Sequence, residues 1–186
     1  MITQQIDVRD VLARVGPDWP DRPDLVTRPT GRAVRSSIET ELALLSGRTV
    51  VVLDFTKVRI IDCSCADEIV AKLVMASLVN ESSLDAFFVI RGLSDDQMED
   101  VDQVLRRQQL VLVAEVGGTL RLVGEVADEA RVTFEHLALR GMAAAEELAA
   151  ELSRPIDVVR AILDELSLRR VLLRDSDGYR PPTAAA

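Results

Sequence analysis

The sequence has few aromatic side chains and must build its core from aliphatic ones. Aromatic residues make up 3% of the 186 residues, whereas hydrophobic residues make up 48%. That apolar share is too high for a disordered chain. The length suits one compact domain or two small domains, each with a modest core.

Cysteine and histidine are too scarce for the common metal and disulfide frameworks. The chain holds Cys63, Cys65 and His136, which are fewer than the four ligands of a structural zinc site. Two cysteines make no disulfide framework, so we expect a protein of the reducing cytoplasm. We expect no metal and no cofactor. His136 stands between Glu135 and Leu137 without a nucleophile or base beside it, so we expect a structural role for it.

Long apolar runs and an excess of positive charge are also missing. No apolar run approaches the roughly 18 residues that a membrane span requires. The opening residues, MITQQIDVRD, have no basic end followed by an apolar stretch, so we expect neither a membrane partner nor a secretory signal. Lys and Arg number 22 against 31 Asp and Glu, a net charge of −9. The whole molecule is therefore not a nonspecific binder of polyanions.

Strand and helix patterns alternate along the N-terminal part of the chain. Residues 50–55 (VVVLDF) and 87–90 are short apolar runs, which are typical of strands buried on both faces. Helices are predicted over residues 30–46, with Thr30 as the cap, and over residues 65–79.

A capped helix and a hairpin complete this part. Ser94 is predicted to cap a helix with an acidic first turn, because negative charge suits that end of the helix dipole. Gly117 and Gly118 separate two apolar runs, a strong signal for a β-hairpin. The alternation predicts an α/β domain with a mixed sheet over residues 1–124. Residues 16–28, rich in proline, are predicted to form a surface loop.

From residue 126 onward the strand signal nearly disappears. Three short helices and a two-stranded wing describe a winged helix, so we predict a second domain over residues 125–182 and a frayed tail over 183–186. The predicted elements are helices over 128–140, 143–152 and 155–168 and strands over 171–174 and 179–180.

The segments TRPTGRAVRSSIETEL and VVVLDFTKVRIIDCSCADEIVAKLV carry motifs at a consistent spacing. They resemble the STAS fold of sulphate transporters and anti-sigma-factor antagonists, and they are most similar to the uncharacterised STAS-like family. That family runs G-R-x-x-R, then D-F-x-x-V, then a serine-rich turn and A-D-E. Here these motifs are Gly31-Arg32 with Arg35, Asp54-Phe55 with Val58, and Ala66-Asp67-Glu68. The resemblance covers roughly residues 25–123 and implies a STAS-like fold for the N-terminal domain.

The resemblance also implies a site. In the sigma-regulating branch of the fold the turn reads Asp-Ser-Ser-Gly, and a partner kinase phosphorylates a serine there. Asp62 matches the Asp and Ser64 the second Ser, whereas Cys63 and Cys65 replace the first Ser and the Gly. Asp62 and Ser64 are therefore candidates for a phospho-switch or a partner-binding surface. The alternative from the residues alone is that Ser64 caps the helix that starts near Cys65.

Other polar residues near this turn have two interpretations each. Cys63 and Cys65 either have lowered thiol pKa values at a helix start, which would suit a redox sensor, or pack beneath the turn. Arg32 and Arg35 either hold an anion or form ion pairs, Arg35 with Glu39.

Neighbouring carboxylates offer no catalytic pair. Asp67 and Glu68 are adjacent, so on a helix they diverge by about 100°, too far for acid–base chemistry. We expect them to complement the helix start, and we expect a non-catalytic protein, since no nucleotide-binding motif is present either.

The segment AAAEELAAELSRPIDVVRAILDELSLRRVLLRDSDGYRP resembles the winged helix-turn-helix of bacterial regulators, with Arg170 where many relatives carry Gly before the wing. The resemblance implies contact with DNA, and Arg154, Arg160, Arg170 and Arg174 are the candidate residues. Residues 118–186 nevertheless hold nine Arg against twelve acidic residues, a net of −3. That balance gives no basic footprint.

Two functions remain open. In the first, the chain is a bacterial transcription regulator whose winged helix binds DNA while the STAS-like domain senses a partner. In the second, both domains bind proteins, as in an adaptor of a partner-switching or assembly pathway. An enzyme is the least favoured reading. A homodimer is expected in either case, paired through a long helix such as residues 128–140.

Overall fold

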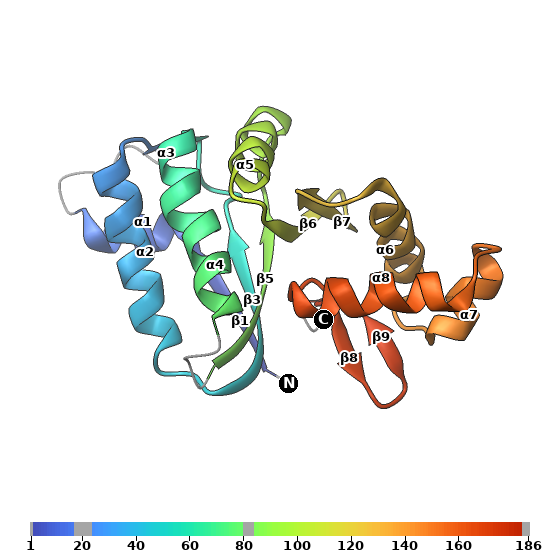
Figure 1. Ribbon diagram of the computed structural model, residues 1–186. Helices are drawn as coiled ribbons and strands as arrows, with labels where there is room; N and C mark the ends of the chain where they lie inside the picture. The colour runs from blue at the N-terminus through green and yellow to red at the C-terminus, as the bar shows by residue number, and fades with distance from the viewer. Residues whose placement is uncertain (1, 17–23, 80–83, 184–186) are drawn as a thin grey trace.

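A five-stranded mixed sheet lies at the centre of the computed structural model (Figure 1), which describes residues 2–16, 24–79 and 84–183. The strand order is β1-β3-β5-β6-β7; the first four strands are parallel and β7 is antiparallel to β6. The predicted α/β class with a mixed sheet is confirmed. The strands are β1 (Ile2–Asp7), β3 (Gly47–Asp54), β5 (Leu84–Arg91), β6 (Val111–Val116) and β7 (Thr119–Gly124).

Helices from the N-terminal part cover one face of the sheet. Their apolar side chains share one buried cluster with alternate strand residues such as Val51 and Leu53. A short two-stranded sheet, β2 (Asp24–Leu25) with β4 (Ile60–Ile61), lies beside this layer. The helices are α1 (Val8–Val15), α2 (Arg28–Leu42), α3 (Cys63–Ala66), the π-helical turn η1 (Asp67–Ala71), α4 (Lys72–Leu78) and α5 (Asp95–Arg107).

The C-terminal elements pack on the opposite face of the sheet (Figure 1). Val50, Val52 and Phe87 point to this side and share a second buried cluster with Phe134 and Leu163. Because both faces are covered, β3 needs the continuous apolar run that the sequence shows. The elements are α6 (Asp128–Arg140), α7 (Ala145–Glu151), α8 (Ile156–Leu168), β8 (Leu173–Asp175) and β9 (Gly178–Arg180).

Several predicted elements are confirmed, with shifts at their ends. Ser94 caps α5 in a capping box with Gln97, and Gly117 and Gly118 turn the β6–β7 hairpin with positive φ values. The C-terminal helices and strands lie within two residues of their predicted bounds. The predicted tail falls mostly on residues 184–186, which lie outside the described part of the chain.

Other predictions need correction. The helix predicted over 30–46 spans Arg28–Leu42, and its N-cap is Thr27, so the prediction that Thr30 caps it is wrong. Thr30 instead lies buried in the first turn, where its hydroxyl contacts that of Thr27 at 3.0 Å. The loop predicted over 16–28 contains β2 and the start of α2; its residues 17–23 lie outside the described part. β1 and α1 were not predicted.

No helix in the described residues combines the length and the apolar character that a membrane crossing requires.

Candidate functional site

The Asp62–Ser64 turn joins β4 to α3. Asp62 is the N-cap of α3, and its Oδ1 accepts hydrogen bonds from the Cys65 N–H and the Ser64 hydroxyl, each at 2.8 Å. Its Oδ2 accepts a third from the Thr27 N–H at 3.1 Å. The prediction that Ser64 caps this helix is therefore wrong, because Asp62 does so. The helix also begins at Cys63, two residues before the predicted start.

These hydrogen bonds keep Asp62 ionised. Partial burial opposes its charge, but the N–H groups of Cys65 and Thr27 and the Ser64 hydroxyl outweigh that effect and lower the pKa of Asp62. A phosphate on Ser64 would place about −1.5 to −2 further charges beside this carboxylate. Asp62 Oδ1 would also lose the hydrogen bond that the Ser64 hydroxyl donates. Phosphorylation here would therefore disrupt the turn.

Apolar side chains flank the turn on its exposed side. Val26 follows β2 and Ile60 lies on β4, and the two residues are 41% and 42% exposed. Cys63, the first residue of α3, is also exposed. The turn thus places a hydrogen-bonded polar centre beside exposed apolar side chains.

Neither thiol is activated by its surroundings. Burial and the nearby Asp62 carboxylate raise the pKa of Cys65 to about 12, and its thiol donates to the Thr27 carbonyl at 3.1 Å. Partial burial and a hydrogen bond to Asp100 also raise the pKa of Cys63. The interpretation of a lowered thiol pKa is wrong. The other interpretation, that the thiols pack beneath the turn, is confirmed for Cys65, which is buried. It is wrong for Cys63, which is exposed.

A buried carboxylate behind the turn was missed by the sequence analysis. Glu68 on η1 has no exposed surface, although it was expected only to complement a helix start. Although burial alone opposes ionisation, Lys72 and Arg28 lower the pKa of Glu68. Four cationic groups surround its carboxylate: Lys72 Nζ at 2.5 Å, Arg28 Nη1 at 2.9 Å, Arg35 Nη2 at 3.4 Å and Arg32 Nη2 at 3.9 Å.

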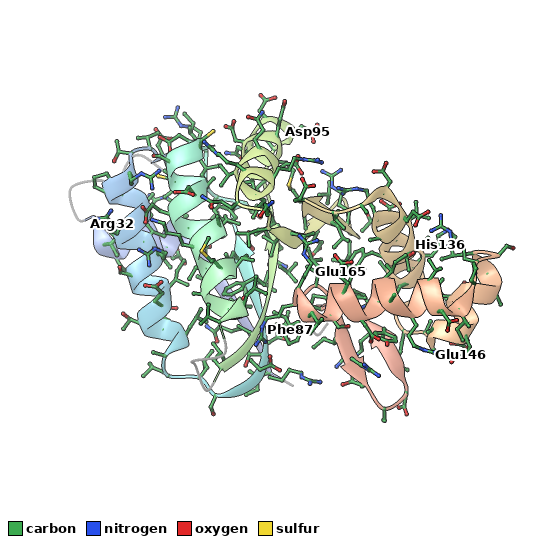
Figure 2. The ribbon with its side chains drawn as sticks, viewed as in Figure 1. Arg32, Phe87, Asp95, His136, Glu146 and Glu165 are labelled. Carbon is green, nitrogen blue, oxygen red and sulfur yellow. The ribbon has the colours of Figure 1, made fainter. Side chains whose placement is uncertain are left out.

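This cluster brings together the motif around Gly31 and the Ala66-Asp67-Glu68 motif of the sequence. Gly31 allows α2 to approach α3, since a Cβ there would lie 3.0 Å from both the Cys65 Cα and the Glu68 Cβ. Arg35 then reaches both Glu68 and Glu39, the latter at 2.6 Å, as the ion-pair interpretation expected. Arg32 lies on the exposed side of α2 (Figure 2). The first and third motifs therefore meet at one ion-pair cluster, and their pairing was the signal that could have revealed it.

Three of the predicted DNA-contacting arginines lie around α7 and α8. Each is close to a carboxylate: Arg160 Nη2 lies 2.6 Å from Glu146 and Arg174 Nη1 lies 2.9 Å from Asp164, whereas Arg154 is 3.9 Å from Glu129. Glu146 is labelled in Figure 2. The positive charge of this face is thus balanced within the molecule.

Arg170 does not lie with the other three. Its side chain is 16% exposed, bonds Asp85 on β5 and stacks over the ring of Phe87 at 5.7 Å from the centroid. Phe87 lies where the sheet meets the C-terminal elements (Figure 2). Arg170 thus joins the sheet to the segment before β8, apart from the exposed arginines around α8. Its role in DNA contact stays a prediction. Its φ of 57° also explains why glycine suits this position.

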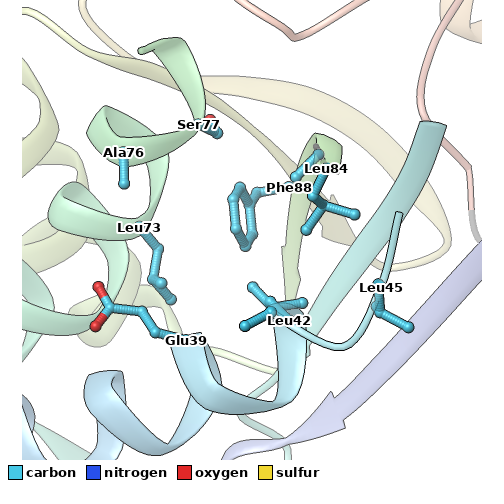
Figure 3. A pocket seen from close by; sticks show the side chains of 10 residues that line it. Glu39, Leu42, Leu45, Leu73, Ala76, Ser77, Leu84 and Phe88 are labelled. Carbon is cyan, nitrogen blue, oxygen red and sulfur yellow. The ribbon is translucent and has the colours of Figure 1, made fainter. Parts of the chain in front are cut away.

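An apolar pocket of about 340 Å³ opens between the ends of α2 and α4 and the start of β5 (Figure 3). Leu42, Leu73 and Phe88 form its wall. The two polar side chains of the lining are already bonded, Glu39 to Arg35 and Ser77 to the Val74 carbonyl. The pocket therefore offers no acid–base or nucleophilic chemistry.

In the described part of the chain, no group of three or more His, Cys, Asp and Glu side chains could hold a metal ion. His136 is exposed on α6 rather than part of the core. No model of a known protein family and no curated protein sequence matches this chain.

Proposed function

We propose that this chain is a non-catalytic bacterial regulatory protein that binds a partner protein through the Asp62–Ser64 turn. In this proposal residues 1–124 form a STAS-like domain and residues 125–182 a winged helix. Parallel strands with helices on one face support the first assignment, and three helices followed by a hairpin support the second. Two free cysteines support a cytoplasmic location.

One observation carries the proposal. Asp62 fixes the turn through three hydrogen bonds, and the exposed Val26 and Ile60 lie on the strands that lead into it. A partner can therefore bury apolar surface around a charged centre of fixed geometry. Phosphorylation of Ser64 would disturb that centre and so release the partner.

The C-terminal domain also fits a protein better than a nucleic acid. Arg160 and Arg174 each contact a carboxylate, and DNA would have to replace Glu146 and Asp164 with phosphates. The released carboxylates would remain near the phosphate backbone and weaken binding. The pairing of these arginines with carboxylates therefore favours the hypothesis that the chain is an adaptor that binds proteins.

DNA binding is the second candidate, because of one specific arrangement. Arg160 and Arg174 line the same hollow, about 220 Å³ in volume, between α8 and the β8–β9 hairpin. Both side chains are well exposed. Recognition helix and wing are the elements that approach DNA in winged-helix proteins.

A titration against fluorescent genomic DNA fragments at two salt concentrations separates the candidates. The adaptor proposal expects no binding at low salt by the folded protein. Binding that falls by orders of magnitude with salt and prefers some fragments would support DNA recognition instead. In that case Arg160→Glu and Arg174→Glu should abolish it. Arg59, just before β4, is also exposed and ion-paired, so Arg59→Glu is the matched control.

The partner surface is tested by affinity capture with the tagged full-length chain. A protein retained by the wild type should be lost with Val26→Asp and with Ser64→Asp. Val158 on α8 is 42% exposed, so Val158→Asp is the matched control and should retain the protein. Equal retention by all three variants would exclude the turn as the contact.

A further inference from the structure

The side of α6 that faces away from the sheet carries an apolar stripe. Val132 and Leu139 are separated by seven residues, so they lie on one face of the helix, and Leu139 is 82% exposed. Glu135 and His136 lie between them and are exposed. Met142, just beyond the helix, continues the exposed apolar surface. An isolated leucine needs no explanation, but a stripe of this length indicates a contact.

A groove of about 560 Å³ runs beside the stripe. Glu135, Ala138 and Leu139 form its α6 side, and Leu120 and Arg121 of β7 form the other. Stripe and groove are therefore one continuous surface.

The neighbouring sheet edge is closed to strand addition at Leu122 and Gly124. In the β6–β7 hairpin every second residue pair exchanges no hydrogen bonds. The backbone N–H and C=O groups of Leu120, Leu122 and Gly124 belong to such pairs, so they point away from β6. The Leu122 carbonyl accepts a hydrogen bond from Arg131, and the Gly124 N–H donates to Asp102 at 2.8 Å. A partner on this side would thus meet the side chains of α6 and not an open strand.

We propose that this surface binds α6 of a second copy of the chain, antiparallel about a two-fold axis. Val132 and Leu139 are equidistant from the midpoint between Glu135 and His136. In an antiparallel pair each Val132 meets Leu139 of the second copy, and each Glu135 meets His136. Reciprocal contacts of this kind are the geometry that a two-fold interface requires.

The charges near the axis are free to make these contacts. Within the described residues, no hydrogen bond or ion pair joins Glu135, His136 or Arg121 to another side chain. Arg121 and Glu135 line the same groove and carry opposite charges, so the surface is electrostatically complementary to a second copy of itself. The proposal does not rest on the proposed function, which would survive its failure.

Sedimentation velocity of the full-length chain over a wide concentration range tests the dimer. One helix and a groove form less than the standard interface of about 1,600 Å², so we expect a reversible dimer with a dissociation constant on the order of micromolar. Leu139→Glu should weaken it at least about tenfold. Leu44→Glu and Leu168→Glu, at 86% and 81% exposure elsewhere on the surface, should leave it unchanged. A monomer at every concentration, or a dimer that tolerates Leu139→Glu, would overturn the proposal.

A charge exchange tests the antiparallel register. His136→Glu places a carboxylate beside Glu135 of the second copy and should weaken the dimer. Adding Glu135→Arg to that variant restores opposite charges and should recover the affinity. A double variant as weak as the single one would overturn the antiparallel pairing.

Discussion

Arg35 on α2 and Glu68 on η1 form an ion pair, Nη2 to Oε2 at 3.4 Å, that joins two helices distant in the sequence. The carboxylate is fully buried, whereas its cationic partners reach it from the surface. Arg28, Arg32 and Lys72 stay substantially exposed while they satisfy this charge, which limits the cost of desolvation; Arg35 is more deeply buried. This ion pair is also close to the Asp62–Ser64 turn in the chain, because η1 directly follows α3.

Replacing Glu68 should destabilise the fold. In Glu68→Gln the amide cannot neutralise the surrounding cations, and its N–H groups would face Lys72. We expect the free energy of unfolding to fall by about 2–3 kcal/mol, somewhat less than for a fully buried pair, because the cations can be rehydrated. Chemical denaturation measures this change. Asp67→Asn, which also removes a carboxylate bonded to Arg28, is the control and should cost about 1 kcal/mol or less.

The same residue predicts a loss of stability in acid. Its pKa is lower in the folded protein than the ordinary value of 4.5, so its contribution is complete above that value. The contribution disappears as the pH falls through the lower, folded-state pKa. The stability difference between wild type and Glu68→Gln, followed by denaturation from pH 7 to pH 3, should therefore shrink in acid. A difference that stays constant from pH 7 to pH 3 would show that folding does not lower the pKa of Glu68.

Much of the fold was predictable because its signals are local. The run at 50–55, the Ser94 cap and the paired glycines of the hairpin each determine structure within a few residues. β1 escaped prediction because an edge strand can be polar, and Thr3, Gln4 and Gln5 show no apolar alternation. Its place is determined by pairing with β3, which no local pattern encodes.

The candidate site was predictable in position but not in chemistry. Resemblance placed Asp62 and Ser64 at a helix start, which the structure shows. Which of them caps depends on the Thr27 N–H, contributed by a segment 35 residues away. Contacts between distant segments also determine the Glu68 cluster and the position of Arg170, so neither could be predicted from local sequence. The partner of Arg170, Asp85, lies 85 residues earlier.

The cap assignment predicts unequal effects at the turn. Asp62→Ala removes the acceptor of three hydrogen bonds and should lower stability by about 1–2 kcal/mol, the usual cost of losing an N-cap. Ser64→Ala removes one donor and should cost about 0.5 kcal/mol or less. Chemical denaturation of the two variants compares them directly. A larger effect at Ser64 would contradict the assignment of Asp62 as the cap.

The thiols should differ in reactivity. Cys63 is exposed and should be alkylated by iodoacetamide in the folded protein, although slowly, because its pKa is raised. Cys65 is buried with a pKa of about 12 and should react only after unfolding. Mass spectrometry of the labelled peptide distinguishes the two sites, and Cys63→Ala should show almost no labelling under native conditions. Equal labelling of both thiols would mean that the turn opens readily.

Two residues with the same backbone conformation should respond in opposite ways to glycine. Ser153 and Arg170 have φ values of 52° and 57°, a region that costs a non-glycine residue about 1 kcal/mol. Ser153 is exposed, so Ser153→Gly should relieve this strain and raise stability by up to about 1 kcal/mol. Arg170→Gly relieves the same strain but loses the Asp85 ion pair and the contact with Phe87. We therefore expect a net loss for Arg170→Gly in chemical denaturation, and a double-mutant cycle with Asp85→Ala should show coupling of about 0.5 kcal/mol or more. If Arg170→Gly were as stabilising as Ser153→Gly, Arg170 would not hold the C-terminal elements against the sheet.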